Sequence, residues 1–229
     1  MKKESVLNPT IDQTLEIEAL GPYDFRTMRD YALSLQRKGE VERACNERFR
    51  AVQKLEELLE DEDEPMLSWD HANTRAALEV VYGSAVDHFL IDDCEMAAAL
   101  LEWLSELDPE DHLESVSLLA LLYVALEDYE SFDAVVNDLS EGPDRTVTLL
   151  WCGFRRTGTL DAGELRHFRE RYGAYHAEFL AADHPADESY LADIESASPS
   201  TAAQARELWL RTEPLWNRFP DFIAALQKA

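Results

Sequence analysis

Hydrophobic side chains recur every three or four residues through the middle of the chain, between positions 92 and 143. This spacing places them on one face of a helix. The first such helix ends at Asp108-Pro109, because proline has no N–H and disfavours the helical conformation of the residue before it. Pro143 is predicted to end a further helix 34 residues after Pro109, and helix pairs that recur at this period are typical of stacked helix hairpins. The residues that define the first helix are Met96, Leu100, Leu101, Leu104 and Leu107.

The same spacing predicts helices on both sides of this stretch. Asp24 is the expected N-cap of the first of them, because its carboxylate can accept a hydrogen bond from the first turn. The residues before it are expected to form an extended arm, and Thr146–Leu150 is the only short candidate strand. The pattern therefore predicts an all-α fold with about eleven helices. The helices outside the central stretch are predicted at 24–38, 41–59, 68–89, 147–156, 161–182, 190–194 and 200–212, with a last one after Pro214 that is divided near Pro220.

Four predicted turns share one spacing, in which a turn residue stands five positions before the place where the second helix crosses the first. A small side chain is expected at such a crossing, because the two backbones approach closely there. The turn Glu127-Asp128-Tyr129 and the closing Asp108-Pro109 complete a pattern that resembles the tetratricopeptide repeat (TPR) superfamily, with degenerate repeats. The pairs of turn and crossing residues are Gly39 and Ala44, Asp92 and Ala97, Glu127 and Phe132, and Gly158 and Gly163.

The resemblance implies a right-handed α-solenoid of stacked antiparallel helix hairpins over residues 23–182. Residues 1–22 would form an N-terminal arm, and residues 183–229 would form capping helices over the last hydrophobic face. Phe132 departs from the small-residue rule, and the first helix of each pair lacks the tryptophan of the family, so the repeats are degenerate. A plain helical bundle would share this composition and is the alternative fold.

The net charge of −26 is concentrated in one part of the sequence. Between Leu55 and Asp144 there are 26 acidic residues and one basic residue, Arg75. Such a field repels phosphate backbones and anionic lipid, so nucleic acid and membrane surfaces are poor candidates for partners. Two interpretations stay open: the acidic residues keep the protein soluble, or they attract a basic partner. The longest apolar run, Leu118–Leu126, has nine residues, about half of what a membrane span needs.

The sequence contains no constellation of residues that points to catalysis. No pair of the six histidines has the i,i+3 or i,i+4 spacing of a helical metal site, and the acidic run Asp61–Glu64 lacks the glycine and terminal glutamate of a calcium loop. Glycine-rich phosphate loops are absent. We therefore expect a non-enzymatic protein with no cofactor and no metal. Cys45, Cys94 and Cys152 have no C-x-x-C arrangement, which favours reduced cysteines and a cytoplasmic location.

The TPR resemblance also implies a candidate binding surface. In TPR-like hairpins the first helix of each pair lines a concave groove, and this geometry selects one face of each first helix here. The groove would have arginines at its ends and apolar side chains in its middle. Leu33, Gln36, Glu79 and Val86 belong to the same faces. The partner-binding residues predicted in this way are Arg26, Arg29, Arg37, Tyr82, Phe89, Ser117, Leu121, Arg155 and Arg156.

The predicted function is a protein-interaction scaffold that binds a peptide or protein segment in this groove. Arginine pairs with carboxylates at two points, so the groove would suit an acidic peptide with hydrophobic anchors. Alternatively, the arginines pair with the acidic residues of the chain itself, for example Arg26 with Asp30 on one helix. A second alternative concerns the function: a self-associating structural protein, whose exposed apolar face is covered by a second copy in a homodimer.

Overall fold

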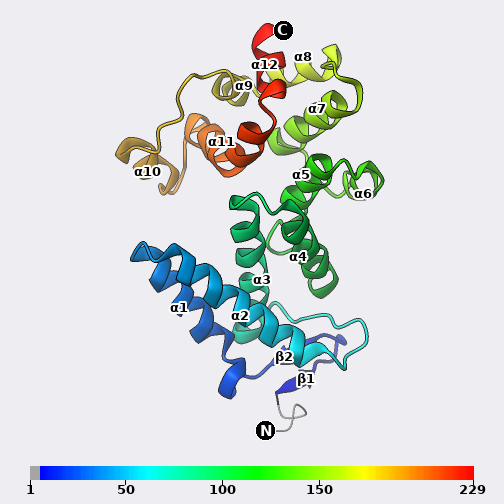
Figure 1. Cartoon of the computed structure of the whole chain (residues 1–229), viewed down its shortest axis with the longest axis vertical. Helices are drawn as coiled ribbons and strands as arrows, with labels where there is room; N and C mark the ends of the chain where they lie inside the picture. Colours follow the sequence, from blue (N-terminus) through cyan, green and yellow to red (C-terminus); the bar gives the residue numbers. More distant parts are fainter. Residues whose placement is uncertain (1–5) are drawn as a thin grey trace. The chain divides into compact units, whose positions relative to one another are not determined.

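A computed structural model describes residues 6–229 of the chain (Figure 1). The described residues are mostly helical, which confirms the predicted all-α class. The contacts divide the chain into two compact units, one that ends at Leu122 and one that runs from Tyr123 to Ala229. The division into an arm, hairpins and a cap stays a prediction.

The first unit begins with two short strands and continues with four long helices. A 3-10 helix, η2, connects the strands to the helices, and helix α5 (Val116–Leu126) spans the boundary between the units. The elements of the first unit are β1 (Leu7–Pro9), β2 (Leu15–Ile17), η2 (Gly21–Tyr23), α1 (Phe25–Arg37), α2 (Val41–Leu59), α3 (Ala72–Leu90) and α4 (Cys94–Leu107).

The ends of these helices follow from local chemistry. The Asp24 side chain accepts a hydrogen bond from the backbone N–H of Thr27, which confirms the predicted N-cap of α1. Gly39 turns the chain between α1 and α2 with a φ of 77°, a conformation that glycine adopts without steric cost. Helix α2 has the predicted bounds. Helix α4 starts after Asp93, whose side chain accepts from the N–H of Met96.

The arm contains a β-hairpin that the sequence analysis missed. Strands β1 and β2 pair antiparallel, with Leu7 opposite Ile17 and Pro9 opposite Leu15. The hairpin is held onto the helices from its second strand. The Leu15 N–H donates to the carbonyl of Met66 at 2.7 Å, and Ile17 is fully buried. Strands of three residues are too short to show an alternating pattern, so the pairing depends on these tertiary contacts.

The four long helices of the first unit pack in sequence order. Helix α1 packs against α2 and α3 against α4, while α3 also contacts both α1 and α2. Of the five residues predicted for one face of α4, Leu100, Leu101, Leu104 and Leu107 are buried, whereas Met96 is 39% exposed. The largest fully buried side chains of this core are Phe25, Leu35, Leu55, Leu58, Leu78, Leu101 and Leu104.

The second unit consists of helices of very different lengths. Helix α7 contacts α8, helix α8 contacts α9, and the long helix α11 packs against α9, α10 and α12. Pro214 lies inside α11. The helices are α6 (Tyr129–Val135), α7 (Pro143–Thr157), α8 (Ala162–Arg171), α9 (Gly173–Phe179), α10 (Glu188–Ile194), α11 (Thr201–Arg218) and α12 (Pro220–Lys228).

Three predictions for the second unit are corrected by the structure. Pro143 begins α7 instead of ending a helix, because proline fits the first turn, where its missing N–H would have no helical partner. The candidate strand Thr146–Leu150 is part of α7. The single helix expected over 161–182 is two helices, because Tyr172 takes a non-helical conformation (φ −123°, ψ 44°) between α8 and α9.

Aromatic side chains form the core of the second unit. The Trp151 ring lies edge-on to that of Trp216, with centroids 5.3 Å apart, and Phe179 contacts Trp216 at 5.4 Å. Such edge-to-face pairs add about 0.5–1.5 kcal/mol each beyond the burial of their area. Helices α7, α9 and α11 therefore meet through rings supplied by each of them.

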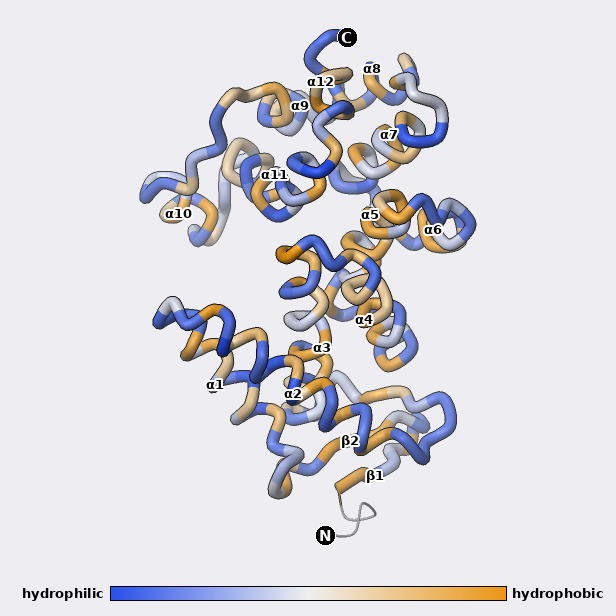
Figure 2. Tube along the Cα trace, in the orientation of Figure 1, coloured by the Kyte–Doolittle hydropathy of each residue, from blue (hydrophilic) through white to orange (hydrophobic). Residues whose placement is uncertain are grey.

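Helix α5 is hydrophobic along its whole length (Figure 2). Residues 119–125 are all buried within the chain. A helix that is apolar on every side has to be covered on every side. Leu121, which belongs to this run, is 6% exposed.

Candidate functional site

A cleft of about 350 Å³ lies in the first unit, between α1 and α3. It forms where the outward face of α1 runs beside that of α3, with one arginine contributed by α2. We call it the α1–α3 cleft. The residues that line it are Arg29, Leu33, Gln36, Arg48, Glu79, Val80, Tyr82, Gly83, Val86, Asp87 and Leu90.

Apolar side chains of α1 and α3 face this cleft. Leu33 is 38% exposed and Leu90 is 60% exposed, whereas the neighbouring Val80 is buried in the core below them. Tyr82 and Val86 are half-buried. Large apolar side chains that gather around a cleft and stay partly open to water are typical of a surface that receives another apolar group.

Two ion pairs border the apolar part of the cleft. Arg29 of α1 hydrogen-bonds to Glu79 of α3, and this bond raises the pKa of the Arg29 guanidinium. Arg48 of α2 binds Asp87 of α3 through two hydrogen bonds of 2.6 Å, which raise the pKa of Arg48. Both arginines are therefore held positive by carboxylates of the chain itself. They do not offer free cations to a ligand.

Gly83 of α3 leaves room for the Arg48 side chain, so that the ion pair of Arg48 with Asp87 can lie against this helix. A Cβ built on Gly83 would stand 3.0 Å from the Cδ atom of Arg48. The Arg48 side chain crosses α3 at this position to reach Asp87, and it also donates to Gln36 of α1 at 3.1 Å. One residue thus connects three helices around the cleft.

The structure brings part of the predicted partner-binding set together at the cleft. Arg29 and Tyr82 line it, as do the four further residues predicted for the same helix faces, Leu33, Gln36, Glu79 and Val86. Phe89, by contrast, is 2% exposed and Leu121 6% exposed, so both side chains are part of the core. Ser117 is half-buried on α5.

The predicted arginines of the second unit are engaged by acidic residues. Arg155 binds Glu127 at 2.6 Å, and Arg156 binds Asp133 at 2.6 Å. The guanidinium of Arg155 also lies over the ring of Phe219, 4.4 Å from its centroid. These contacts agree with the alternative interpretation, in which the arginines neutralise the acid excess of the chain.

The predicted arginines of α1 differ in whether they form ion pairs. Asp30, the partner expected for Arg26, instead binds Arg29 at 2.8 Å. Arg26 and Arg37 are exposed, and neither forms an ion pair with any residue between 6 and 229. They are the predicted groove arginines whose charges stay open to solvent.

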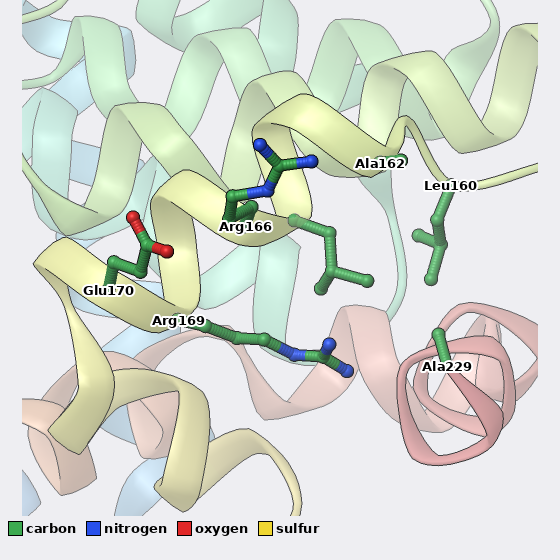
Figure 3. Close-up of a pocket in the computed structure, with 7 residues that line it drawn as sticks. Leu160, Ala162, Arg166, Arg169, Glu170 and Ala229 are labelled. Atoms are coloured by element: carbon green, nitrogen blue, oxygen red, sulfur yellow. The ribbon is translucent and has the colours of Figure 1, made fainter.

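A second pocket, of about 580 Å³, lies in the second unit beside α8 and was not predicted from the sequence (Figure 3). We call it the α8 pocket. Figure 3 shows the guanidinium of Arg169 directed from α8 toward Ala229, and that of Arg166 directed toward the side of Ala162. Its lining residues are Leu160, Ala162, Leu165, Arg166, Arg169, Glu170 and Ala229.

The cations of the α8 pocket have no carboxylate partner within residues 6–229. Glu170 follows Arg166 by four residues, a spacing at which opposite charges pair on a helix, yet no ion pair joins them. Arg169 instead donates from Nε to His176 Nε2 at 3.3 Å. The sequence does contain a sign of this surface, because three arginines fall within Arg166–Arg171.

Outside the two pockets, the cysteine and histidine side chains that could take part in chemistry are buried or in contact with other side chains of the chain. Burial raises the pKa values of the Cys45 and Cys152 thiols, which keeps them protonated and weakly nucleophilic. His112 stacks on Trp69 with centroids 4.7 Å apart and contacts Asp108 at 2.8 Å. Among residues 6–229, no three His, Cys, Asp or Glu side chains are placed to hold a metal ion.

No helix in the described part of the chain combines the length and the apolar character that crossing a bilayer requires. Compared with protein-family models, with curated proteins and with solved structures, the chain matches none.

Proposed function

We propose that the protein is a non-enzymatic interaction scaffold whose first unit binds a protein segment in the α1–α3 cleft. The observation that carries the proposal is the partly exposed apolar surface of the cleft, with Leu33 at 38% and Leu90 at 60% exposure beside half-buried Tyr82. An aliphatic or aromatic side chain placed there would remove this surface from water, at about 25 cal/mol per Å² of apolar area.

The proposal includes a TPR-like arrangement of the helices, with a concave face formed by the first helix of each hairpin. The order of packing in the first unit supports it: α1 packs on α2, α3 packs on α4, and α1 also contacts α3. In such an arrangement the α1–α3 cleft lies between the first helices of two successive hairpins. A peptide bound there would contact the side chains of both.

The charges of the unit favour a particular kind of segment. Arg29 and Arg48 are neutralised by Glu79 and Asp87, so the cleft itself offers no free cation to an acidic peptide. The sequence around it is strongly acidic, with only Arg75 among 26 acidic residues from Leu55 to Asp144. We therefore propose a segment with an apolar anchor and basic flanking residues, which the field of the unit would attract. A cytoplasmic setting is part of this proposal.

The test uses charge placed into the cleft. Leu33→Asp combined with Leu90→Asp puts two carboxylates where the anchor would lie, and Leu191→Asp, on α10, changes a side chain that is 46% exposed outside the cleft. Partners recovered with the wild-type protein by photocrosslinking are expected to be lost with the cleft variant and retained with Leu191→Asp. Equal recovery with all three proteins would contradict the proposal.

The alternative function, self-association, gives a different result in the same proteins. Light scattering would then show a mass that rises with the concentration of the wild-type protein and falls to that of a monomer in the cleft variant. In that case the occupant of the cleft is a second copy of the chain. A wild-type mass that equals that of a monomer at every concentration removes this alternative.

A further inference from the structure

The α8 pocket places two arginines without a carboxylate partner beside accessible apolar surface, whereas the open Arg26 and Arg37 line neither this pocket nor the α1–α3 cleft. The chain has a net charge of −26, and the arginines Arg29, Arg48 and Arg156 all bind carboxylates of the chain. Arg166 and Arg169 are exposed and bind no carboxylate of residues 6–229. In a molecule with so many acidic side chains, two neighbouring arginines without such a partner indicate a site for an external anion.

The two guanidinium groups can act together. They belong to residues three apart on one helix, a spacing at which side chains are neighbours on the helix surface. Figure 3 shows the guanidinium of Arg169 directed toward Ala229 and that of Arg166 directed toward the side of Ala162, while the carboxylate of Glu170 lies on the side away from Ala229. Each guanidinium can bind a carboxylate through two hydrogen bonds. The pair therefore fits two carboxylates of one segment, one at each guanidinium.

Three further lining residues are apolar. They are Leu160, Ala162 and Leu165, and the pocket's volume of about 580 Å³ is larger than that of the α1–α3 cleft. Leu160 is half-buried, whereas Leu165 is 6% exposed and forms the base from which the pocket opens. This apolar surface would accept an aliphatic side chain beside the anion.

We propose that the α8 pocket binds an acidic protein segment through Arg166 and Arg169, with an aliphatic side chain of that segment placed among Leu160, Ala162 and Leu165. The site lies in the second unit and uses no residue of the α1–α3 cleft. The proposal therefore goes beyond the function proposed for the cleft and does not depend on it.

The charge of the whole protein selects a short acidic segment over a nucleic acid. Screening limits electrostatic interactions to about 8–10 Å at physiological salt, so a few carboxylates close to Arg166 and Arg169 experience mainly the local positive field. A nucleic acid continues its phosphate charges far beyond the pocket, where the excess of acidic residues repels it. The apolar lining favours the same choice, because a phosphate backbone offers no aliphatic group to it.

The test measures the binding of a designed probe to the full-length protein by fluorescence anisotropy. The probe is a short fluorescein-labelled peptide rich in Asp and Glu with two leucines. Two comparison peptides have Ser in place of Leu, or Asn and Gln in place of Asp and Glu, and a single-stranded oligonucleotide of equal charge serves as a third ligand. We expect the acidic leucine peptide to bind best, and its affinity to fall as salt is raised.

The variant Arg166→Gln with Arg169→Gln is expected to weaken binding of this peptide by about tenfold to a hundredfold, because two charge-assisted contacts are lost. Arg43→Gln with Arg50→Gln is the matched control. It removes the same charge from exposed arginines of α2, whose side chains are 60% and 70% exposed. Circular dichroism melting verifies that both variants are folded.

Several results would overturn the proposal. One is an equal loss of affinity in both double variants, which would indicate a general effect of charge. A second is unchanged binding when Ser replaces the leucines, which would exclude the apolar contact. The others are tighter binding of the oligonucleotide than of the peptide, and no detectable binding of the peptide at low salt. Because the cleft of the first unit is intact in both variants, failure here leaves the function proposed for it unaffected.

Discussion

Arg48 and Asp87 connect α2 to α3 through a two-point ion pair in which Nε and Nη2 of the arginine each lie 2.6 Å from a different carboxylate oxygen. The side chains are only 10% and 12% exposed. A nearly buried pair of this kind is costly to break, because the partner that remains keeps its charge in a poorly solvated place.

Replacement of Asp87 by Ala is therefore expected to destabilise the protein by about 3–5 kcal/mol, since the Arg48 guanidinium would stay buried without a counterion. The free energy of unfolding from urea titration measures this loss. The matched control is Glu47→Ala, which breaks the exposed pair of Glu47 with Arg50 and should cost less than about 1 kcal/mol. Equal effects of the two substitutions would show that the Arg48–Asp87 pair is solvated in solution.

The β-hairpin of the arm shows why part of this fold was not predictable from the sequence. Leu7–Pro9 and Leu15–Ile17 are each three residues long, too short for a pattern such as Leu15-Glu16-Ile17 to identify a strand. The second strand is held by Asn73 and Thr74 on α3, which bond to Ile17 from more than fifty residues away in the sequence. Helix α2, in contrast, was predicted with its bounds, because its apolar spacing, its turn at Gly39 and its acidic end are all local features.

The α1–α3 cleft and the α8 pocket also differ in how far the sequence predicted them. The faces of α1 and α3 that form the cleft followed from helical spacing and the TPR resemblance, so Arg29, Tyr82 and Leu33 were found from the sequence. Which arginines are neutralised depends on tertiary contacts, such as that of Arg156 with Asp133, and no spacing predicts it. The α8 pocket escaped prediction because Leu160 and Ala229 come from distant parts of the sequence.

Asn73 provides a test of how the arm is attached. Its Nδ2 donates to the carbonyls of Ile17 and Tyr23 at 2.9 Å, and its Oδ1 accepts from the Arg26 N–H at 3.2 Å. Asn73→Ala leaves the two buried carbonyls and the partly buried Arg26 N–H without this partner. We expect a loss of about 2–3 kcal/mol and faster proteolysis of the arm, measured by limited digestion and mass spectrometry.

The control for this prediction is Asn8→Ala, which removes an exposed contact of Asn8 with Glu18 at 3.3 Å. A surface substitution of this type should change stability by less than about 0.5 kcal/mol. If Asn73→Ala left the arm as resistant to protease as Asn8→Ala does, the attachment of the hairpin would not depend on this side chain.

Trp151 and Trp216 are neighbours, and we expect the same substitution to change the stability of the protein by different amounts at the two positions. Trp151 is fully buried, and within residues 6–229 its Nε1–H meets no acceptor, whereas Trp216 donates from Nε1 to the Thr212 hydroxyl at 2.8 Å. Phenylalanine removes the N–H in both cases. Trp216→Phe is therefore expected to cost about 1 kcal/mol more than Trp151→Phe, because only Trp216 loses a hydrogen bond.

Urea unfolding followed by circular dichroism measures this difference without relying on tryptophan fluorescence, which both substitutions change. The two rings are in contact, so a loss of packing area affects the same core in each variant. A larger loss for Trp151→Phe would mean that its N–H has an acceptor in solution.

Glu178 connects α9 to α11 and to the segment between α9 and α10. Its carboxylate is 10% exposed and accepts hydrogen bonds from Arg206 and from His184 Nδ1, the latter at 2.7 Å. Burial by itself would raise the pKa of Glu178, but the hydrogen bonds from Arg206 and His184 outweigh it and hold this pKa below its usual value of 4.5. The carboxylate is thus bound more favourably in the folded protein than in the unfolded chain.

A group whose pKa is lowered by folding stabilises the protein at pH values above its pKa in the unfolded chain. This contribution is lost as the pH falls through the pKa that the group has in the folded protein. The contribution of Glu178 to the free energy of unfolding should therefore change little between pH 7 and pH 5, and fall below about pH 4.5.

Arg206→Gln should cost about 1.5–3 kcal/mol at pH 7, because it removes a charge-assisted contact from a mostly buried carboxylate, and the difference from wild type should shrink at pH 3. Arg211→Gln is the control, since its pair with Asp144 is half exposed and should contribute less than about 1 kcal/mol at either pH. A difference between Arg206→Gln and wild type that is as large at pH 3 as at pH 7 would show that the ionised Glu178 carboxylate is not what Arg206 stabilises.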